Sequence, residues 1–153
     1  MGKILSQMAK WSENIELLVG VMMTTCLALL LLSMSAYNYP SWYGGKEKHV
    51  HSLIPAGLGM LIGLSSFGVR VEKARKAAAH IAVLCGMAGI GGAVPGLMKL
   101  PKILAGDKTV AKPDAARIQA VMFVVCVPFV VFSVAWFVSN RRAQKAKEAG
   151  KGK

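Results

Sequence analysis

The chain has 153 residues, of which 54% are hydrophobic, and it carries a formal net charge of +12. Its mean hydropathy is +0.48, and the apolar residues fall in long blocks. Such blocks exclude an ordinary water-soluble domain, and the lack of alternating apolar and polar positions excludes a membrane β-barrel.

The first residues, 3–14, are predicted to form a short amphipathic segment. Ile4, Leu5, Met8 and Trp11 fall on one face of a helix with a period of about 3.6 residues. A helix of this kind lies along a membrane surface with its apolar face in the lipid.

Four apolar blocks follow. A helix needs about 18 residues or more to cross a hydrocarbon core roughly 30 Å thick, and each block is about that long. They predict one all-α membrane domain, residues 1–153, built as a four-transmembrane-helix bundle. We expect the first and fourth helices, rich in Leu, Val, Met and Phe, to face lipid more than the other two. The predicted spans are residues 17–37, 53–69, 77–97 and 118–138.

Aromatic rings lie close to the ends of these spans. Tyrosine and tryptophan favour the headgroup layer because each ring has an apolar body and a polar atom. The predicted interfacial anchors are Trp11, Tyr39, Trp42, Tyr43 and Trp136.

Small residues recur on one face of the second and third spans, at spacings of three and four that form a continuous stripe. Hydrophobicity does not drive helices together in lipid, so association depends on close van der Waals contact, which small residues permit. Both spans also contain G-x-x-x-G. The predicted helix-packing residues are Ala56, Gly59, Gly63 and Ser66 in the second span, and Ala78, Ala82, Gly86, Gly89, Gly92, Ala93 and Gly96 in the third.

A connection of six residues, Val71–Lys76, makes the second and third spans antiparallel neighbours. The sequence therefore predicts a central hairpin rich in glycine and alanine. We expect the two small-residue stripes to face one another, or to face a copy of themselves in an oligomer.

The glycine-rich stretch 85–96 does not match a phosphate-binding loop. The dinucleotide motif would need a glycine where Val94 stands, and the P-loop string G-x-x-x-x-G-K-[ST] does not occur. The sequence contains no recognisable nucleophile–base pair, and no ionisable residue lies near the middle of a span, where coupled transporters carry one. We therefore predict that the chain is not an enzyme.

Basic residues are distributed unequally between the two sides of the predicted bundle, with twelve on the side of the chain termini and seven on the other. The positive-inside rule then places both termini in the cytoplasm, in a bacterial inner membrane. The basic tail, residues 139–153, indicates contact with anionic lipid headgroups, or docking of a partner protein, and no nucleic acid. The residues predicted to meet headgroups or a partner are Arg70, Lys73, Arg75, Lys76, Arg141 and Arg142.

Histidines and cysteines are the candidate metal ligands. His49 and His51 supply two ligands, fewer than a zinc site uses, and His80 lies near the opposite end of the bundle. Each span except the second has one cysteine near its middle, where a thiol packs as a small hydrophobic group. We predict no cofactor and no metal within one chain, and leave open a ligand shared with another chain.

A resemblance to known proteins rests on the four predicted spans and on two segments, HSLIPAGLGMLIGL and RVEKARKAAAHIAVLCGMAGIGGA. The chain resembles small uncharacterised bacterial membrane proteins with four transmembrane helices. The SLIPAG segment and the glycine spacing are also similar to the glycine-rich transmembrane protein 14 family. The resemblance implies the four-helix fold and no activity.

Together these observations predict a non-catalytic integral membrane protein that packs against other membrane helices. It would be an accessory subunit of a larger complex or a self-assembling unit. The alternatives are a small passive transporter or channel for an apolar or amphipathic solute, lined by the glycine-rich helices, and a redox or cofactor-binding subunit.

Overall fold

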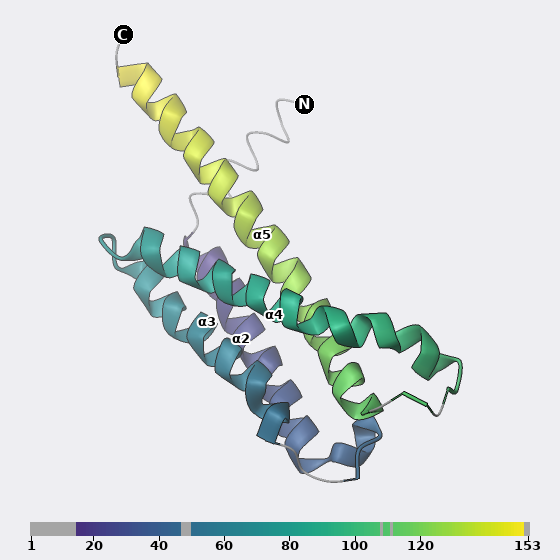
Figure 1. Cartoon of the computed structure of the whole chain (residues 1–153). Helices are drawn as coiled ribbons and strands as arrows, with labels where there is room; N and C mark the ends of the chain where they lie inside the picture. Colours follow the sequence, from purple (N-terminus) through teal and green to yellow (C-terminus); the bar gives the residue numbers. More distant parts are fainter. Residues whose placement is uncertain (1–14, 47–49, 108, 111, 152–153) are drawn as a thin grey trace.

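A computed structural model describes residues 15–46, 50–107, 109–110 and 112–151, with the side chains of 144 and 146–151 left out. The described part of the chain is helical and contains no β-strand. Four of its helices are long and apolar enough to cross a membrane, which confirms the predicted all-α membrane fold (Figure 1). The elements are α2 (Ile15–Asn38), η1 (Pro40–Tyr43), η2 (Val50–Leu53), α3 (Ile54–Arg70), α4 (Arg75–Leu104) and α5 (Pro113–Lys151).

The helix ends follow from local backbone chemistry. Pro55 lies in the first turn of α3, where a missing N–H costs nothing. Helix α2 ends before the Tyr39–Pro40 pair, because a residue that precedes proline disfavours the helical conformation. Gly44 ends η1 with a φ of 83°, a left-handed conformation that glycine adopts without strain.

Helices α4 and α5 are longer than the predicted spans. Helix α4 continues through Pro95 and Pro101, and α5 continues past the apolar block as a basic helix. Alanine, lysine, arginine and glutamine, which are all good helix formers, dominate α5 after Asn140. Figure 1 shows the C-terminal part of α5 projecting beyond the other helices.

The helices form a ring in which each contacts two neighbours. The most extensive contact is between α4 and α5, followed by α2 with α3 and α3 with α4, and the least extensive is between α2 and α5. Short connections make successive helices antiparallel (Figure 1). The buried interior contains large side chains from α2, α3 and α5, and only glycine and alanine from α4.

The expectation that the first and fourth spans face lipid more than the other two fails at the third span. Of the most apolar stretch of each helix, 44% of α3 and 39% of α2 are buried inside the protein, against 28% of α4 and 28% of α5. Helix α4 is as exposed as α5 because it buries only glycine and alanine and directs its large side chains outward.

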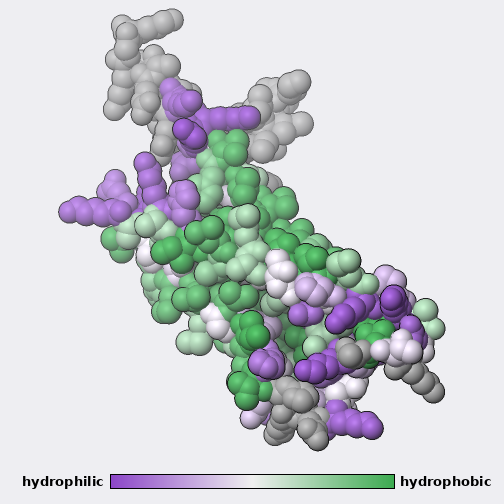
Figure 2. Space-filling model, viewed as in Figure 1, coloured by the Kyte–Doolittle hydropathy of each residue, from purple (hydrophilic) through white to green (hydrophobic). Residues whose placement is uncertain are grey.

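The distribution of hydrophobic and hydrophilic residues on the surface is the one that a membrane protein requires. On the face shown in Figure 2, hydrophobic residues cover the middle of the molecule and hydrophilic residues gather toward its two ends. Large apolar side chains on all four helices point outward, where lipid tails can solvate them. Helical hydrogen bonds satisfy the polar backbone groups as the hydrocarbon core demands, except where a proline inside α4 or α5 has no N–H to donate.

Candidate functional site

The small-residue stripe of α3 lies against α2. A Cβ atom at Gly59 would lie 3.0 Å from the Cβ of Leu29 and 3.1 Å from the carbonyl oxygen of Cys26. At Gly63 it would lie 2.7 Å from the sulfur of Cys26. A side chain at Gly59 would press on the α2 backbone, and one at Gly63 would displace the Cys26 sulfur, while Ala56, nearer the start of α3, is half-buried.

Ser66 adds a polar contact to the same interface. Its hydroxyl lies 2.6 Å from the carbonyl oxygen of Gly63 and 3.3 Å from the sulfur of Met23 on α2. The hydroxyl of this buried serine is therefore satisfied within the protein, as buried polar groups require.

The small-residue stripe of α4 lies against α5. A Cβ atom at Gly86 would lie 2.7 Å from Val130, and one at Gly89 would lie 2.7 Å from the sulfur of Cys126. At Gly96 it would lie 2.9 Å from the backbone oxygen of Ala116. We call the buried residues Gly86, Gly89, Ala93 and Gly96 the inward face of α4.

The prediction that the two stripes face one another is therefore wrong. Helices α3 and α4 are neighbours, and Ala78 meets Gly68 beside their turn, but each stripe turns to the helix on its other side. A glycine stripe leaves a groove, and the branched and aromatic side chains of a neighbour fill that groove better than a second glycine stripe does. Leu29 and Phe129 are such side chains, and both are buried.

Gly92 does not belong with the other glycines of its motif. It is exposed, and a Cβ atom there would meet only the terminal methyl of Met122, at 3.9 Å. At Gly91 a Cβ atom would meet nothing within 4 Å. These two residues, with Ala88 and Pro95, occupy an exposed side of α4 that we call its outward face.

The predicted basic residues surround one end of the bundle, which we call the basic rim. Arg70 forms an ion pair with Glu16 at 3.0 Å, and the two side chains are 50% and 70% exposed. Arg75 donates to the carbonyl oxygen of Val69 at 3.0 Å and so links α4 to the end of α3. The exposed residues of the rim are Arg70, Lys73, Lys76, Arg141 and Arg142, and Arg75 is half-buried.

Aromatic contacts join α5 to this rim. The ring of His80 lies 4.9 Å from the ring of Phe137, and Trp136 meets Phe137 edge-on at 5.6 Å. Trp136 is only 5% exposed, so it is a packed core residue and not the exposed ring predicted as a headgroup anchor. The sequence could not show this. The position of Trp136 near the end of the span suggests an exposed ring, but the rotation of α5 about its axis turns the ring inward.

The opposite end of the bundle carries the other aromatic rings. Tyr39 and Trp42 stack with ring centroids 4.8 Å apart, and both are exposed. The Tyr43 and Ser35 hydroxyls are 2.8 Å apart, which links η1 to α2. Trp11, the remaining predicted anchor, lies outside the described residues.

The candidate metal ligands do not come together in the described part of the chain. No group of three or more His, Cys, Asp or Glu side chains there could hold a metal ion. The thiols of Cys26 and Cys126 lie against glycines of α3 and α4, so they act as packing surfaces. His51 is exposed in η2, and His49 lies outside the described residues.

Sequence reasoning missed a groove between α2 and α5 and a set of buried polar atoms. The Oγ atoms of Ser33 and Ser133 and the indole nitrogen of Trp136 are buried and have no hydrogen-bond partner among the residues that the structure describes. No sequence signal identifies either feature, because both depend on how α2 and α5 are rotated.

The fold and its contacts define an all-helical protein with four membrane-length helices, held by small residues at two of the helix interfaces. No family model, no curated protein and no solved structure matches the chain.

Proposed function

We propose that the protein is a non-catalytic membrane protein that works by packing against other membrane helices. It acts as an accessory subunit of a larger membrane complex or as a self-assembling unit. The observation that carries this proposal is the outward face of α4, where small residues are exposed in the middle of a membrane-length helix.

The outward face is shaped to receive another helix. Ala88, Gly91, Gly92 and Pro95 are exposed, and they follow spacings of three, one and three that keep them on one side of α4. The larger side chains of Leu84 and Met98, 64% and 75% exposed, bound this side one turn before and one turn after. A neighbouring helix can therefore approach the α4 backbone between them, the contact on which association in lipid depends.

A backbone acceptor adds to this surface. Pro95 has no N–H to donate to the carbonyl oxygen of Gly91, four residues earlier in the helix. In hydrocarbon a carbonyl without a donor is costly, and a polar group of an adjacent helix can satisfy it. A partner helix that supplies a hydroxyl or amide donor here gains both van der Waals contact and a hydrogen bond.

The basic rim supports an orientation of the protein in the membrane and supports anionic lipid as a second partner. An excess of lysine and arginine at one end is typical of the cytoplasmic side, which would place both termini in the cytoplasm of a bacterial cell. Exposed Arg70, Arg141 and Arg142 are suited to anionic lipid headgroups, each contributing about 1 kcal/mol near the membrane surface.

The transporter alternative has less support from the packing. It required a path lined by the glycine-rich helices, but Gly63 lies against Cys26 and Gly89 lies against Cys126. A path cannot follow glycines whose missing side chains are already replaced by neighbouring atoms. Passive transport remains a prediction that a liposome flux assay can test.

Co-purification from gently solubilised native membranes tests the proposal. We expect cross-linking before solubilisation to capture the wild-type protein with another chain, and Gly91→Leu to abolish most of that adduct by filling the outward face. Gly57→Leu is the matched control, because Gly57 is also an exposed helix residue at which a Cβ meets nothing. Recovery of the wild type as an isolated monomer would contradict the proposal.

A further inference from the structure

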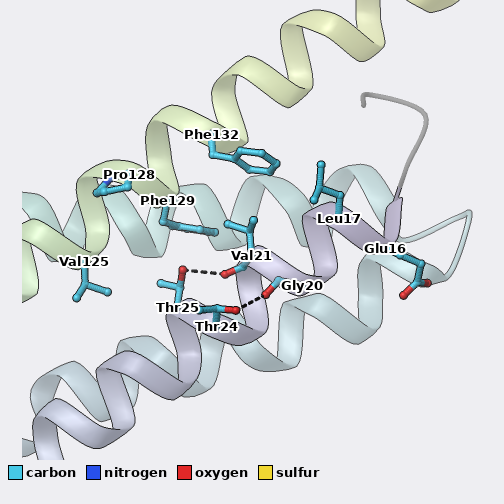
Figure 3. Close-up of a pocket in the computed structure, with 10 residues that line it drawn as sticks. All are labelled: Glu16, Leu17, Gly20, Val21, Thr24, Thr25, Val125, Pro128, Phe129 and Phe132. Carbon is cyan, nitrogen blue, oxygen red and sulfur yellow. Dashed lines mark hydrogen bonds between the residues drawn. The ribbon is translucent and has the colours of Figure 1, made fainter. Parts of the chain in front are cut away.

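The groove between α2 and α5 is a second unfilled surface, separate from the outward face of α4. Its volume is about 510 Å³, within the range of about 300–1,000 Å³ typical of small-molecule sites. Figure 3 shows it between the two helices, with Phe129 and Phe132 on α5 directed toward Val21 and Leu17 on α2. It lies where the helix contact of the ring is least extensive.

Gly20 leaves this space open. It lines the groove on α2, it is exposed, and a Cβ atom at this position would meet nothing within 4 Å. The glycines of α3 and α4 that pack against a neighbour differ in this respect, because their missing side chains are replaced by atoms of α2 or α5. The absence of a side chain at Gly20 therefore creates a hollow and not a helix contact.

The lining of the groove is apolar in its chemistry. Its two threonines use their hydroxyls within α2: Thr24 donates to the carbonyl oxygen of Gly20 at 2.9 Å, and Thr25 donates to that of Val21 at 2.8 Å (Figure 3). With these donors occupied, the threonines offer methyl groups to an occupant. Side chains of Val125, Pro128 and the two phenylalanines complete an apolar wall. Such a wall suits a hydrocarbon chain.

One end of the groove is charged. Glu16 belongs to its lining and is paired with Arg70, an exposed residue of the basic rim. A molecule whose tail lies along α2 would place its other end beside this ion pair, in which the Glu16 carboxylate lines the groove and the half-exposed Arg70 guanidinium lies next to it. From Glu16 to Thr25 the groove follows nine helical rises, about 13 Å at about 1.5 Å each, which is the depth of much of one bilayer leaflet.

From this arrangement we propose that the groove binds a glycerophospholipid, with one acyl chain between α2 and α5 and the phosphate beside Arg70. Glu16 and Arg70 offset each other's charge, so complementarity to the phosphate comes from the excess of exposed cations on the basic rim, to which Arg141 and Arg142 contribute. The hydrocarbon chain fills the space left at Gly20. The bilayer already solvates acyl chains, so selectivity comes from van der Waals fit and the headgroup charge. This inference is independent of the outward face of α4.

Native mass spectrometry of the delipidated protein, titrated with palmitoyl-oleoyl phosphatidylglycerol, tests the inference. We expect one lipid to bind the wild type, and Gly20→Leu to weaken that binding about tenfold or more because the new side chain occupies the groove. Thr24→Leu, on the same wall, should weaken binding in the same direction. Gly57→Leu is the control and should bind as the wild type does.

The headgroup is tested separately. Arg70→Gln should reduce the preference for phosphatidylglycerol over a diacylglycerol with the same chains, and added salt should reduce the wild-type preference in the same way. Equal lipid binding by the Gly20→Leu and Gly57→Leu proteins would overturn the inference. A cross-link that places another helix, from a second copy or from a partner, in the groove of the membrane-embedded wild type would also overturn it.

Discussion

The two faces of α4 carry the same kind of residue and have opposite surroundings. On the inward face, a Cβ atom at Gly86, Gly89 or Gly96 would come within 3.0 Å of atoms on α5. On the outward face, a Cβ atom at Gly91 would meet nothing and one at Gly92 would barely meet a methyl group. One helix therefore uses glycine both to hold its own bundle together and to leave a surface open.

This difference shows that a glycine in a membrane helix has no fixed meaning. Where a neighbouring helix already fills the missing side chain, the glycine is required for folding. Where nothing fills it, glycine costs the helix about 0.5–1 kcal/mol relative to alanine, and folding alone gives no reason to keep it. Substitutions on the two faces of α4 should therefore change the stability of the fold in opposite directions.

The largest effect is expected at the end of the inward face. In Gly96→Ala, the new methyl would lie 2.9 Å from the backbone oxygen of Ala116 and 2.5 Å from the Cβ of Gln119. Because a backbone cannot yield as a side chain does, we expect a loss of about 3 kcal/mol or more in the free energy of unfolding. The free energy of unfolding is measured by denaturing the protein in mixed micelles while circular dichroism monitors its helix content.

The matched control for this change is Gly91→Ala on the outward face. We expect a gain of about 0.5–1 kcal/mol, since alanine favours the helix and meets no obstacle. Equal effects of the two substitutions would show that the faces do not differ as described.

A smaller effect, with a specific rescue, is expected at Gly89. Gly89→Ala brings a methyl to 2.7 Å from the sulfur of Cys126, which should cost about 1–2 kcal/mol. Cys126→Ala removes that sulfur and leaves the Cβ of residue 126 at 3.7 Å, an ordinary contact. The double variant should therefore be more stable than Gly89→Ala alone, and a double-mutant cycle that shows no coupling would be inconsistent with the contact.

Two buried serines differ in whether their hydroxyls form a hydrogen bond. Ser133 is buried on α5, and its Oγ has no partner in the described part of the chain, so Ser133→Ala should stabilise the fold by about 1 kcal/mol. Ser66→Ala is the matched change at a bonded serine and should destabilise the fold by a similar amount. Parallel unfolding titrations measure both, and the same sign for the two variants would count against the assignment.

The smallest effect concerns the loop after α4, which belongs to neither face. The hydroxyl of Thr109 donates to Asp107 Oδ1 at 2.7 Å and its backbone N–H does so at 2.9 Å, and these bonds lower the pKa of Asp107. The ionised form is therefore favoured in the folded state. Its contribution to stability is present above the ordinary carboxyl pKa and is lost as pH falls through the lowered value.

Thr109→Ala should accordingly raise the pKa of Asp107 toward its ordinary value while leaving the helix contacts unchanged. Titration of the Asp107 carboxyl by NMR provides the measurement. A pKa that does not move would mean that the Thr109 hydroxyl does not hold the carboxylate.

The existence of the four spans could be predicted from the sequence because hydropathy and length decide it. Their ends could not, because α4 passes through Pro95 and Pro101 and α5 runs on as a basic helix to Lys151. A fall in hydropathy marks the edge of the apolar block and does not mark the end of the helix.

Helical periodicity also showed which small residues share a face, and most of them are buried together. It did not show what covers each face. The short turn makes α3 and α4 neighbours but leaves each free to rotate about its axis, and the bulky side chains of α2 and α5 decide that rotation. Trp136 and the α2–α5 groove escaped prediction for the same reason.

Photo-crosslinking in native membranes tests the central claim most directly. A photoreactive residue is placed at Gly92 on the outward face of α4, or at Leu64, an exposed position on α3 that serves as control. If the outward face receives another helix, position 92 yields a defined protein adduct and position 64 yields lipid adducts. Lipid adducts alone at both positions would contradict the account.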